Sequence, residues 1–222
     1  LFPYTTLFRS ANLALPGANY VNFLSTSTGQ LEIAKNLTGT IPEVYVNLGG
    51  TGPVLLSGDN SGLTTSTQIL LWGGRTLKGH ANAFGTNNIR VGTGSGTILD
   101  LNGFDISNTL NLDTNSTIDN SGASDSAVTS ALSYSAAGTS RNFSLNASGG
   151  NVLDVQTDLT ADTAFVFVNA APGVVQLSGN NSLAWDLLRV NNGTFRVGSA
   201  TALASNAVSI GNNGIASALL DI

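Results

Sequence analysis

The chain has 222 residues, only 9% of them charged, and a formal net charge of −5. The chain has 8 basic residues and 13 acidic ones, which argues against a nucleic-acid partner and against an anionic membrane surface, because both bind to basic patches. The absence of Cys excludes disulfides, zinc-finger spacing and thiol catalysis, and no run of about 18 apolar residues predicts a membrane-spanning helix. Because 41% of the residues are apolar and 26 are Gly, we predict a folded chain with many turns.

The first ten residues differ in character from the rest. Phe2 to Ser10 resembles the translation of a sequencing-library adapter, and the chain lacks a starting Met. Leu1 to Ser10 is therefore predicted to be an assembly artefact, with an aromatic N-terminal strand as the alternative. The remainder, 11–222, is predicted to be a single domain that belongs to a longer protein.

Short strands are predicted along the rest of the chain. Tyr20–Leu24, Leu31–Ile33, Val44–Leu48 and Val54–Leu56 come first, and Pro42 and Pro53 are expected to precede strands. The pattern is clearest from Thr97 to Asp119, where triplets place one polar residue between two apolar ones, a period that only a strand has. These triplets are Val44–Val46, Ile89–Val91, Leu99–Leu101, Phe104–Ile106, Leu110–Leu112, Phe143–Leu145, Leu153–Val155, Phe195–Val197, Val208–Ile210 and Leu220–Ile222.

Blocks of sequence recur about 120 residues apart. Leu56–Ser61 (LSGDNS) returns as Leu177–Ser182 (LSGNNS). Further along, Ile69-Leu70 matches Leu187-Leu188, Thr76–Lys78 matches Thr194–Arg196, Ala83–Asn87 matches Ala202–Asn206, and Leu99–Leu101 matches Leu220–Ile222. Five blocks in the same order predict a stacked array of coils of roughly 20 to 25 residues, in which no unit buries its apolar face alone. The leading fold is an all-β solenoid.

These blocks resemble a known family. Gly173–Asn181, Leu188–Gly198 and Ala202-Leu203 resemble the passenger-associated β-strand repeat of autotransporters, in which an LSG-N-N phrase precedes N-x-G-T-L and V-G phrases. Two family-like copies are expected at about 54–103 and 174–222. Trp72–Arg75 and Trp185 depart from the family pattern and leave the local turn geometry open.

The resemblance implies a right-handed parallel β-helix from the passenger of a large exported bacterial surface protein. It further implies a non-enzymatic stalk segment, plausibly adhesin-like, located at the cell surface or outside the cell after export through the outer membrane. The implied partners are the neighbouring coils of the full-length protein and host or environmental glycans or surface proteins. Neither nucleic acid binding nor membrane insertion by this segment is expected.

No residue is assigned as catalytic, cofactor-binding or metal-binding. His80, the single histidine, lies among Gly and Asn and is expected in an exposed turn. Two acidic groups are candidate calcium sites. Solvated turn residues are the better interpretation of the first, and the spacing of the second fits neither an EF-hand nor a glycine-rich nonapeptide pattern. The first group is Asp154, Asp158 and Asp162, and the second is Asp113, Asp119 and Asp125. Gly92–Gly96 lacks the Lys-Ser/Thr and the helix of a phosphate loop and is predicted to be a turn.

Two alternatives remain open. A polysaccharide lyase or hydrolase needs paired carboxylates, or a base beside an acidic cluster, yet Glu32 and Glu43 lie outside the repeats and the basic residues are scattered. Arg196, aligned with Lys78, indicates a repeated outward position. A carbohydrate-binding module would need exposed aromatic residues on one face, with Trp72, Trp185, Tyr45 and Tyr134 as candidates, although core or edge packing is favoured for them. The strand pattern also predicts that Leu101→Asp abolishes cooperative unfolding and that Asp100→Asn changes little.

Overall fold

The computed structural model describes residues 13–14, 19–26, 28–92, 94, 96–113, 115–134, 141–159, 164–181, 187–203, 207–211 and 217–222. Within these ranges every regular element is a strand, and no helix is present. The predictions made for residues 1–10, Asp162, Trp185 and residues 204–206 lie outside the described ranges. The same holds for the side chain of Tyr134.

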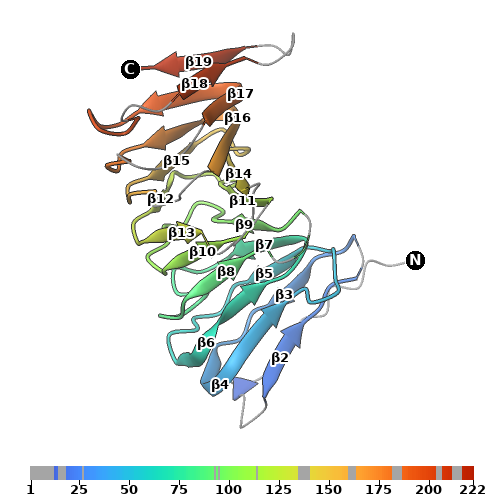
Figure 1. Cartoon of the computed structure of the whole chain (residues 1–222). Coiled ribbons are helices and arrows are strands. Elements are labelled where there is room, and N and C mark those ends of the chain that lie inside the picture. The colour runs from blue at the N-terminus through green and yellow to red at the C-terminus, as the bar shows by residue number, and fades with distance from the viewer. Residues whose placement is uncertain are drawn as a thin grey trace.

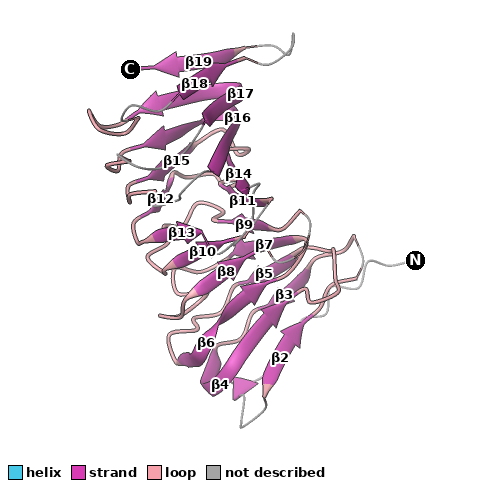
Figure 2. Ribbon diagram, viewed as in Figure 1, coloured by secondary structure: helices cyan, strands magenta, loops and turns pink. Residues whose placement is uncertain are grey.

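Two parallel sheets wind along the molecule (Figures 1 and 2). The first runs in the order β1-β4-β6-β8-β10-β13, with β2 also paired to β4. Its strands are β1 (Leu13–Ala14), β2 (Tyr20–Phe23), β4 (Leu37–Val46), β6 (Leu63–Leu71), β8 (Ile89–Val91), β10 (Leu110–Leu112) and β13 (Leu132–Tyr134).

The second sheet holds the remaining strands. Its order is β12-β15-β16-β14-β11-β9-β7-β5-β3, and β17 joins β16 to β18 and β19. The bounds are β3 (Leu31–Ile33), β5 (Val54–Leu56), β7 (Arg75–Lys78), β9 (Ile98–Asp100), β11 (Ser116–Asp119), β12 (Ser126–Val128), β14 (Arg141–Asn146), β15 (Val152–Val155), β16 (Ala164–Leu177), β17 (Leu187–Val197), β18 (Ala207–Ile210) and β19 (Ala218–Asp221).

The chain forms a parallel β-solenoid of about seven turns, which confirms the predicted fold class. Every strand pairs in parallel with the strand one coil away, and in Figure 1 the colour changes steadily from one end of the stack to the other. None of the described segments is a helix long and apolar enough to cross a membrane. The long strands β4, β6, β16 and β17 each bend from one face of the solenoid to the next, so that β16 pairs with β14 through its first part and β15 through its last.

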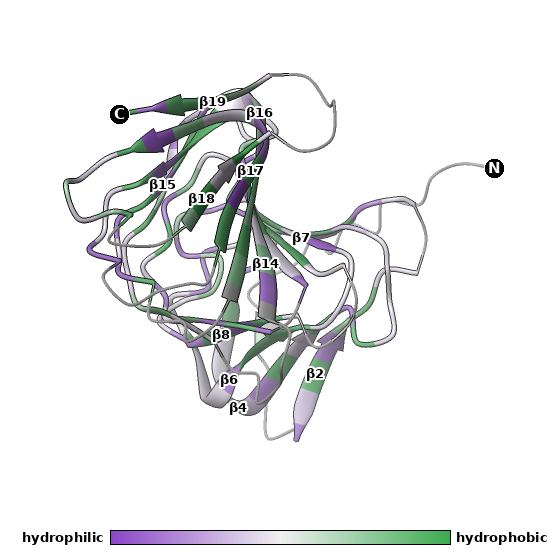
Figure 3. Cartoon of the chain, turned by 45° about the horizontal axis from the view of Figure 1, so that its top comes forward, coloured by the Kyte–Doolittle hydropathy of each residue, from purple (hydrophilic) through white to green (hydrophobic). Residues whose placement is uncertain are grey.

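Aliphatic side chains stacked in columns hold the coils together. One column consists of inward residues in register on five successive coils, each at most 2% exposed: Val44, Ile69, Ile89, Leu110 and Leu132. Buried and partly exposed positions alternate along strands such as β5 and β7, and in Figure 3 hydrophobic and hydrophilic bands alternate along β2. Full burial of such a side chain stabilises the fold by about 1.5–3 kcal/mol.

Buried asparagines at the turns add a second set of bonds between coils. In the first LSG phrase, Asn60 accepts the Leu37 N–H at 2.7 Å and donates to the Ala83 carbonyl at 2.6 Å. In the second, Asn181 accepts the Leu159 N–H at 2.8 Å and donates to the Ala202 carbonyl at 2.9 Å. Both asparagines are 0% exposed. Each therefore bridges the coil before it and the coil after it in the same way.

The glycine of the same phrase sits against the preceding coil. A Cβ atom on Gly58 would lie 2.1 Å from the Lys35 carbonyl oxygen, and one on Gly179 would lie 2.2 Å from the Thr157 carbonyl oxygen. Any side chain at either position would push the backbones of two coils apart. The LSG-x-N phrase is thus a coil-to-coil contact as well as a turn.

The structure corrects three local predictions. Of the predicted triplets, Phe104–Ile106 does not form a strand, because only Ile106 makes an isolated bridge, to Val128. Pro42 lies inside β4, at a register irregularity between Ile41 and Glu43, while Pro53 does precede β5. The third correction concerns the faces of β7.

Lys78 points inward, although the alignment with Arg196 predicted an outward position. Thr76 and Lys78 are 0% and 1% exposed, whereas in the aligned segment of β17, Thr194–Arg196, the buried residue is Phe195 and Arg196 faces out. The aligned segments are therefore out of step by one residue, and a shift of one residue in a strand exchanges its two faces. Ile69 and Leu188, both buried, show the same displacement from the predicted match of Ile69 with Leu187.

Candidate functional site

His80 lies in the turn that follows β7, as predicted, but its side chain is half-buried and not exposed. His80 Nδ1 accepts a hydrogen bond from the Asn82 N–H at 3.1 Å, and this is the one hydrogen bond of the imidazole among the described residues. The nearby Asp59 carboxylate accepts the Ser61 N–H and an Asn82 amide N–H, and these bonds lower the pKa of Asp59, with a smaller electrostatic effect of His80. These contacts tie two turns together and place no nucleophile against the imidazole.

The described members of the two candidate calcium groups are each engaged within the chain. Asp113 binds Arg90 through two bonds of 2.9 and 3.2 Å, and Asp125 accepts the Val152 N–H at 2.8 Å. Asp158 accepts the Asn180 N–H at 2.6 Å. Among the residues that the structure describes, no three His, Cys, Asp or Glu side chains are placed to hold a metal ion.

Carboxylates on the outer faces bind serines of the following coil. We call these the carboxylate–serine contacts, and the four of them are Glu32–Ser57, Asp100–Ser121, Asp119–Ser148 and Asp154–Ser178. The oxygen–oxygen distances lie between 2.5 and 2.8 Å, short as expected of hydroxyl donors to a carboxylate. Their acidic side chains are used between coils, which is a structural role.

Arg75 joins two of these contacts into one cluster. Its guanidinium pairs with Asp100 and, at 3.0 Å, with Asp119, one coil further on. Both carboxylates are 0% exposed although they point away from the aliphatic core. The expectation that Asp100 tolerates Asn was based on a solvated outer face, and the burial of its carboxylate contradicts that basis.

An acidic hollow of about 380 Å³ lies on the outer face of the second sheet. Its lining is Asp105, Asp125, Ser126, Ala127, Val152, Asp154, Gln156, Gln176 and Arg196. The carboxylates meet here, yet each is already engaged: Asp105 and Asp125 accept main-chain N–H groups of the next coil. Asp154 accepts bonds from Ser178 and from the Gln156 amide.

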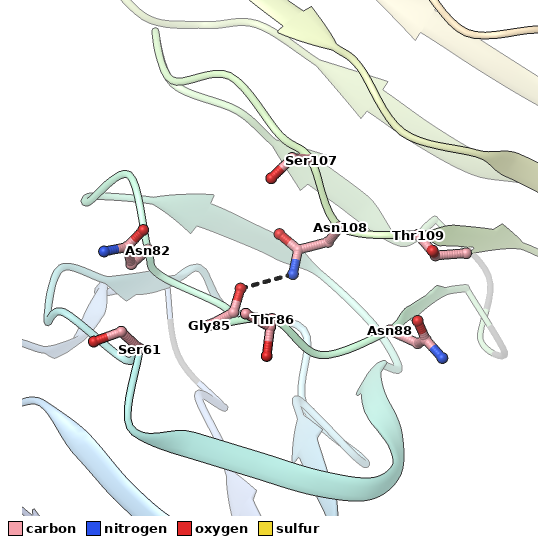
Figure 4. A pocket seen from close by; sticks show the side chains of 8 residues that line it. All are labelled: Ser61, Asn82, Gly85, Thr86, Asn88, Ser107, Asn108 and Thr109. Atoms are coloured by element: carbon pink, nitrogen blue, oxygen red, sulfur yellow. Dashed lines mark hydrogen bonds between the residues drawn. The ribbon is translucent and has the colours of Figure 1, made fainter.

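A second hollow, of about 250 Å³, opens between the turns of three coils (Figure 4). It is lined only by uncharged polar residues and glycine: Ser61, Asn82, Gly85, Thr86, Asn88, Ser107, Asn108 and Thr109. The Asn108 amide, which points into this region in Figure 4, donates to the Gly85 carbonyl at 2.9 Å. Its second bond, to the Asn87 carbonyl, completes another coil-to-coil bridge.

Aromatic residues gather on the outer face of the first sheet. The Tyr20 and Tyr45 rings meet edge to face with centroids 5.4 Å apart, and the Tyr45 and Trp72 centroids are 6.3 Å apart. We call this surface the aromatic face, defined by the outward residues of β2, β4 and β6 and the residue after β6: Tyr20, Asn22, Glu43, Tyr45, Gln68, Leu70 and Trp72.

Glu43 borders the rings. The Tyr45 hydroxyl donates to Glu43 Oε2 at 2.5 Å, and this bond, with a smaller effect of burial, raises the pKa of Tyr45. The phenol therefore stays protonated at neutral pH and holds the carboxylate beside the rings. Tyr20 is 56% exposed, whereas Leu70, which also faces outward between Tyr45 and Arg90, is only 5% exposed.

Sequence reasoning found part of this face. Tyr45 and Trp72 were candidates for a carbohydrate-binding surface and do lie on one face; Trp185 and the Tyr134 side chain lie outside the described residues. Tyr20 was missed, and Glu43 was set aside for lying outside the repeats. Both could have been found by aligning Tyr20–Phe23 with Glu43–Val46, the strand one coil later.

Comparison of the chain with protein-family models, with curated proteins and with solved structures gave no match.

Proposed function

We propose that this chain is a non-enzymatic structural segment of a large exported bacterial surface protein, serving as a rigid stalk that displays other parts of that protein outside the cell. The observation that carries the proposal is the use of the outer polar side chains. Each carboxylate that the structure describes accepts a hydrogen bond within the chain, and most of the donors belong to the next coil. Such a surface builds a rod and leaves few groups for chemistry.

The resemblance of the LSG and N-x-G-T phrases to the passenger-associated repeat supports the same proposal. Exported passengers need a fold that can be lengthened without redesign, and stacked coils whose stability is a sum over neighbouring interfaces meet that need. The absence of Cys is compatible with export, since stacking makes disulfides unnecessary.

The test is an export assay with the whole chain. The 222 residues are placed between a signal peptide and an outer-membrane translocating barrel that exports a known passenger, and intact cells are treated with protease. We expect the chain on the cell surface, where its rod resists cleavage. Retention inside the cell of a chain that folds when purified contradicts the proposal, provided that the known passenger is exported in parallel.

A polysaccharide-acting enzyme is the second candidate, and the acidic hollow is the observation that favours it. Hydrolysis of a glycosidic bond requires two carboxyl groups on either side of that bond. The purified chain is incubated with polygalacturonate and with alginate, and new reducing ends and unsaturated uronates are measured. We expect neither product. Product formation that disappears in the Asp125→Asn variant would replace the structural proposal by an enzymatic one.

A further inference from the structure

The aromatic face combines aromatic rings with polar groups that have no partner within the described chain. Glu43 accepts one bond, from Tyr45, on Oε2, and Oε1 has no partner within the described chain. Neither the Gln68 amide nor the Trp72 indole N–H makes a hydrogen bond to any residue that the structure describes. One acceptor and two donor groups are therefore available beside the exposed Tyr20 ring and the partly buried rings of Tyr45 and Trp72.

The rings form a diagonal row across the strands and not a cage. Tyr20, Tyr45 and Trp72 come from three successive coils, and each lies two residues further along the strand direction than the one before it. The ring centroids are 5.4 Å and 6.3 Å apart. The planes of Tyr20 and Tyr45 meet at 85° and those of Tyr45 and Trp72 at 58°, with each pair in contact. Because the rings pack on one another, no space is left between them in which a cation could be surrounded.

The charge of the face restricts the ligand further. Glu43 is the single charged residue among its members, and the chain as a whole carries a net charge of −5, so a polyanion would be repelled. An acyl chain would need a continuous apolar surface, but the aliphatic member, Leu70, is covered. The ligand that fits is uncharged, carries many hydroxyl groups and has flat C–H surfaces to place against Tyr and Trp.

We propose that the aromatic face binds an uncharged oligosaccharide whose chain follows the diagonal row of rings across the coils, with sugar rings against Tyr20 and Trp72 and hydroxyl groups bonded to Glu43, Gln68 and the Trp72 indole. The strands hold these side chains at the spacing of the coils, so that binding should cost little conformational entropy. Tyr45 acts as a positioning residue, since its hydroxyl holds the Glu43 carboxylate beside the rings. This site adds a binding surface to the stalk and does not require that the stalk be exported.

The experiment measures binding of cellohexaose, mannohexaose and chitohexaose to the whole chain by tryptophan fluorescence. A Trp185→Phe background makes the emission report Trp72. We expect saturable binding of at least one hexasaccharide. Tyr20→Ala should weaken it about tenfold, as removal of an aromatic contact residue typically does. Tyr20 is 56% exposed, so its removal should leave the fold intact, as circular dichroism would verify.

Glu43→Gln and Gln68→Ala provide the polar arm, and each should weaken binding severalfold. The matched control is Phe165→Ala, which removes a 38% exposed aromatic ring from β16, far along the rod from the aromatic face, and should not change the affinity. Trigalacturonate and choline serve as anionic and cationic probes. The proposal is overturned if no hexasaccharide binds, if Tyr20→Ala binds as tightly as the parent chain, or if only a charged probe binds. Cleavage of a polysaccharide by the parent chain would contradict the proposed non-enzymatic function. The binding measurements on the variants would still decide whether the aromatic face binds an oligosaccharide.

Discussion

The environment of Lys78 was not predicted by the strand pattern, which placed this side chain on the outer face. It occupies an inward position of β7, 1% exposed, and its ammonium group donates to the carbonyls of Ala81 at 3.0 Å and Asp105 at 2.6 Å. Burial lowers the pKa of Lys78 to about 8, and the Asp105 charge opposes this shift in part. Its four-carbon stem fills the core where an aliphatic residue would stand, and its charge is met by main-chain oxygens.

This burial predicts a pH dependence that Lys78→Met should remove. Between about pH 8 and 10.5 the unfolded chain holds a proton on Lys78 that the folded chain has released, so the free energy of unfolding rises with pH in that window. The rise, relative to Lys78→Met, should total about 3 kcal/mol. Urea unfolding at pH 7, 9 and 10.5 measures it, and parallel stability curves for the two proteins would contradict the burial of a charged ammonium group.

Asparagine illustrates what a sequence can and cannot specify at this scale. The LSG phrase identified Asn60 and Asn181 as members of one repeated turn. The structure places both of their amides against main-chain groups of the two neighbouring coils. Elsewhere Asn146, Asn169 and Asn191 bond amide to amide on successive coils, at 3.4 and 3.1 Å. A sequence shows that a polar residue recurs, but the identity of its partner depends on which backbone atoms the winding brings next to it.

The alternation of apolar and polar residues predicted most strand positions correctly and misjudged the outer face. In β9 and just beyond it, Leu99 and Leu101 point inward as expected and are 0% exposed. Asp100 points outward and is equally buried, because Arg75, Ser121 and the neighbouring strands cover it. Periodicity predicts the direction of a side chain but not its solvent exposure, because the residues that bury an outward side chain belong to other coils.

We therefore expect Asp100→Asn to be costly, contrary to the expectation from the pattern. The carboxylate accepts bonds from the Asn102 and Ser121 N–H groups, the Ser121 hydroxyl and Arg75, and an amide cannot accept all of them. The loss should be about 2–4 kcal/mol, as for other broken buried ion pairs. The control is Asp221→Asn. The Asp221 side chain is 47% exposed and its partner Arg196 is 41% exposed, so this ion pair should contribute less than about 1 kcal/mol. Similar midpoints for the two variants in urea, followed by circular dichroism, would contradict this.

At the scale of the whole molecule, the period of the winding governs which changes the fold tolerates. Ile69, Ile89 and Leu110 lie in register on successive coils, and Thr76, Leu99 and Ile118 do so on the second sheet. Removal of residues 89–109 takes out one complete coil and brings Leu110 opposite Ile69. The shortened chain should unfold in a single transition with a stability lower by a few kcal/mol, since one interface is lost.

Removal of residues 89–98 is the matched comparison. It deletes about half a coil, so the strands that follow meet the wrong face of the stack and their apolar residues leave the core. We expect this variant to lose the cooperative transition in thermal unfolding followed by circular dichroism. If both deletions behave alike, the coils do not act as interchangeable units.

The solenoid was predictable from the sequence as a whole, whereas the aromatic face was predicted only in part, through Tyr45 and Trp72. Recurring triplets and the LSG blocks depend only on local pattern, and they specified parallel stacking. The aromatic face depends on the number of residues per coil, which varies from about 19 between Leu99 and Ile118 to about 27 between Ile118 and Leu145. Without that count, Tyr20 and Trp72 could not be placed beside Tyr45.

The direction of the main-chain hydrogen bonds has a mechanical consequence. In a stack of parallel strands these bonds point from each winding to the next, along the length of the rod. Tension applied to the two ends therefore opens one winding at a time. Each winding of about 22 residues that opens lengthens the molecule by roughly 70–80 Å of extended chain. A tether of this kind yields stepwise under load and absorbs a sudden pull before it fails.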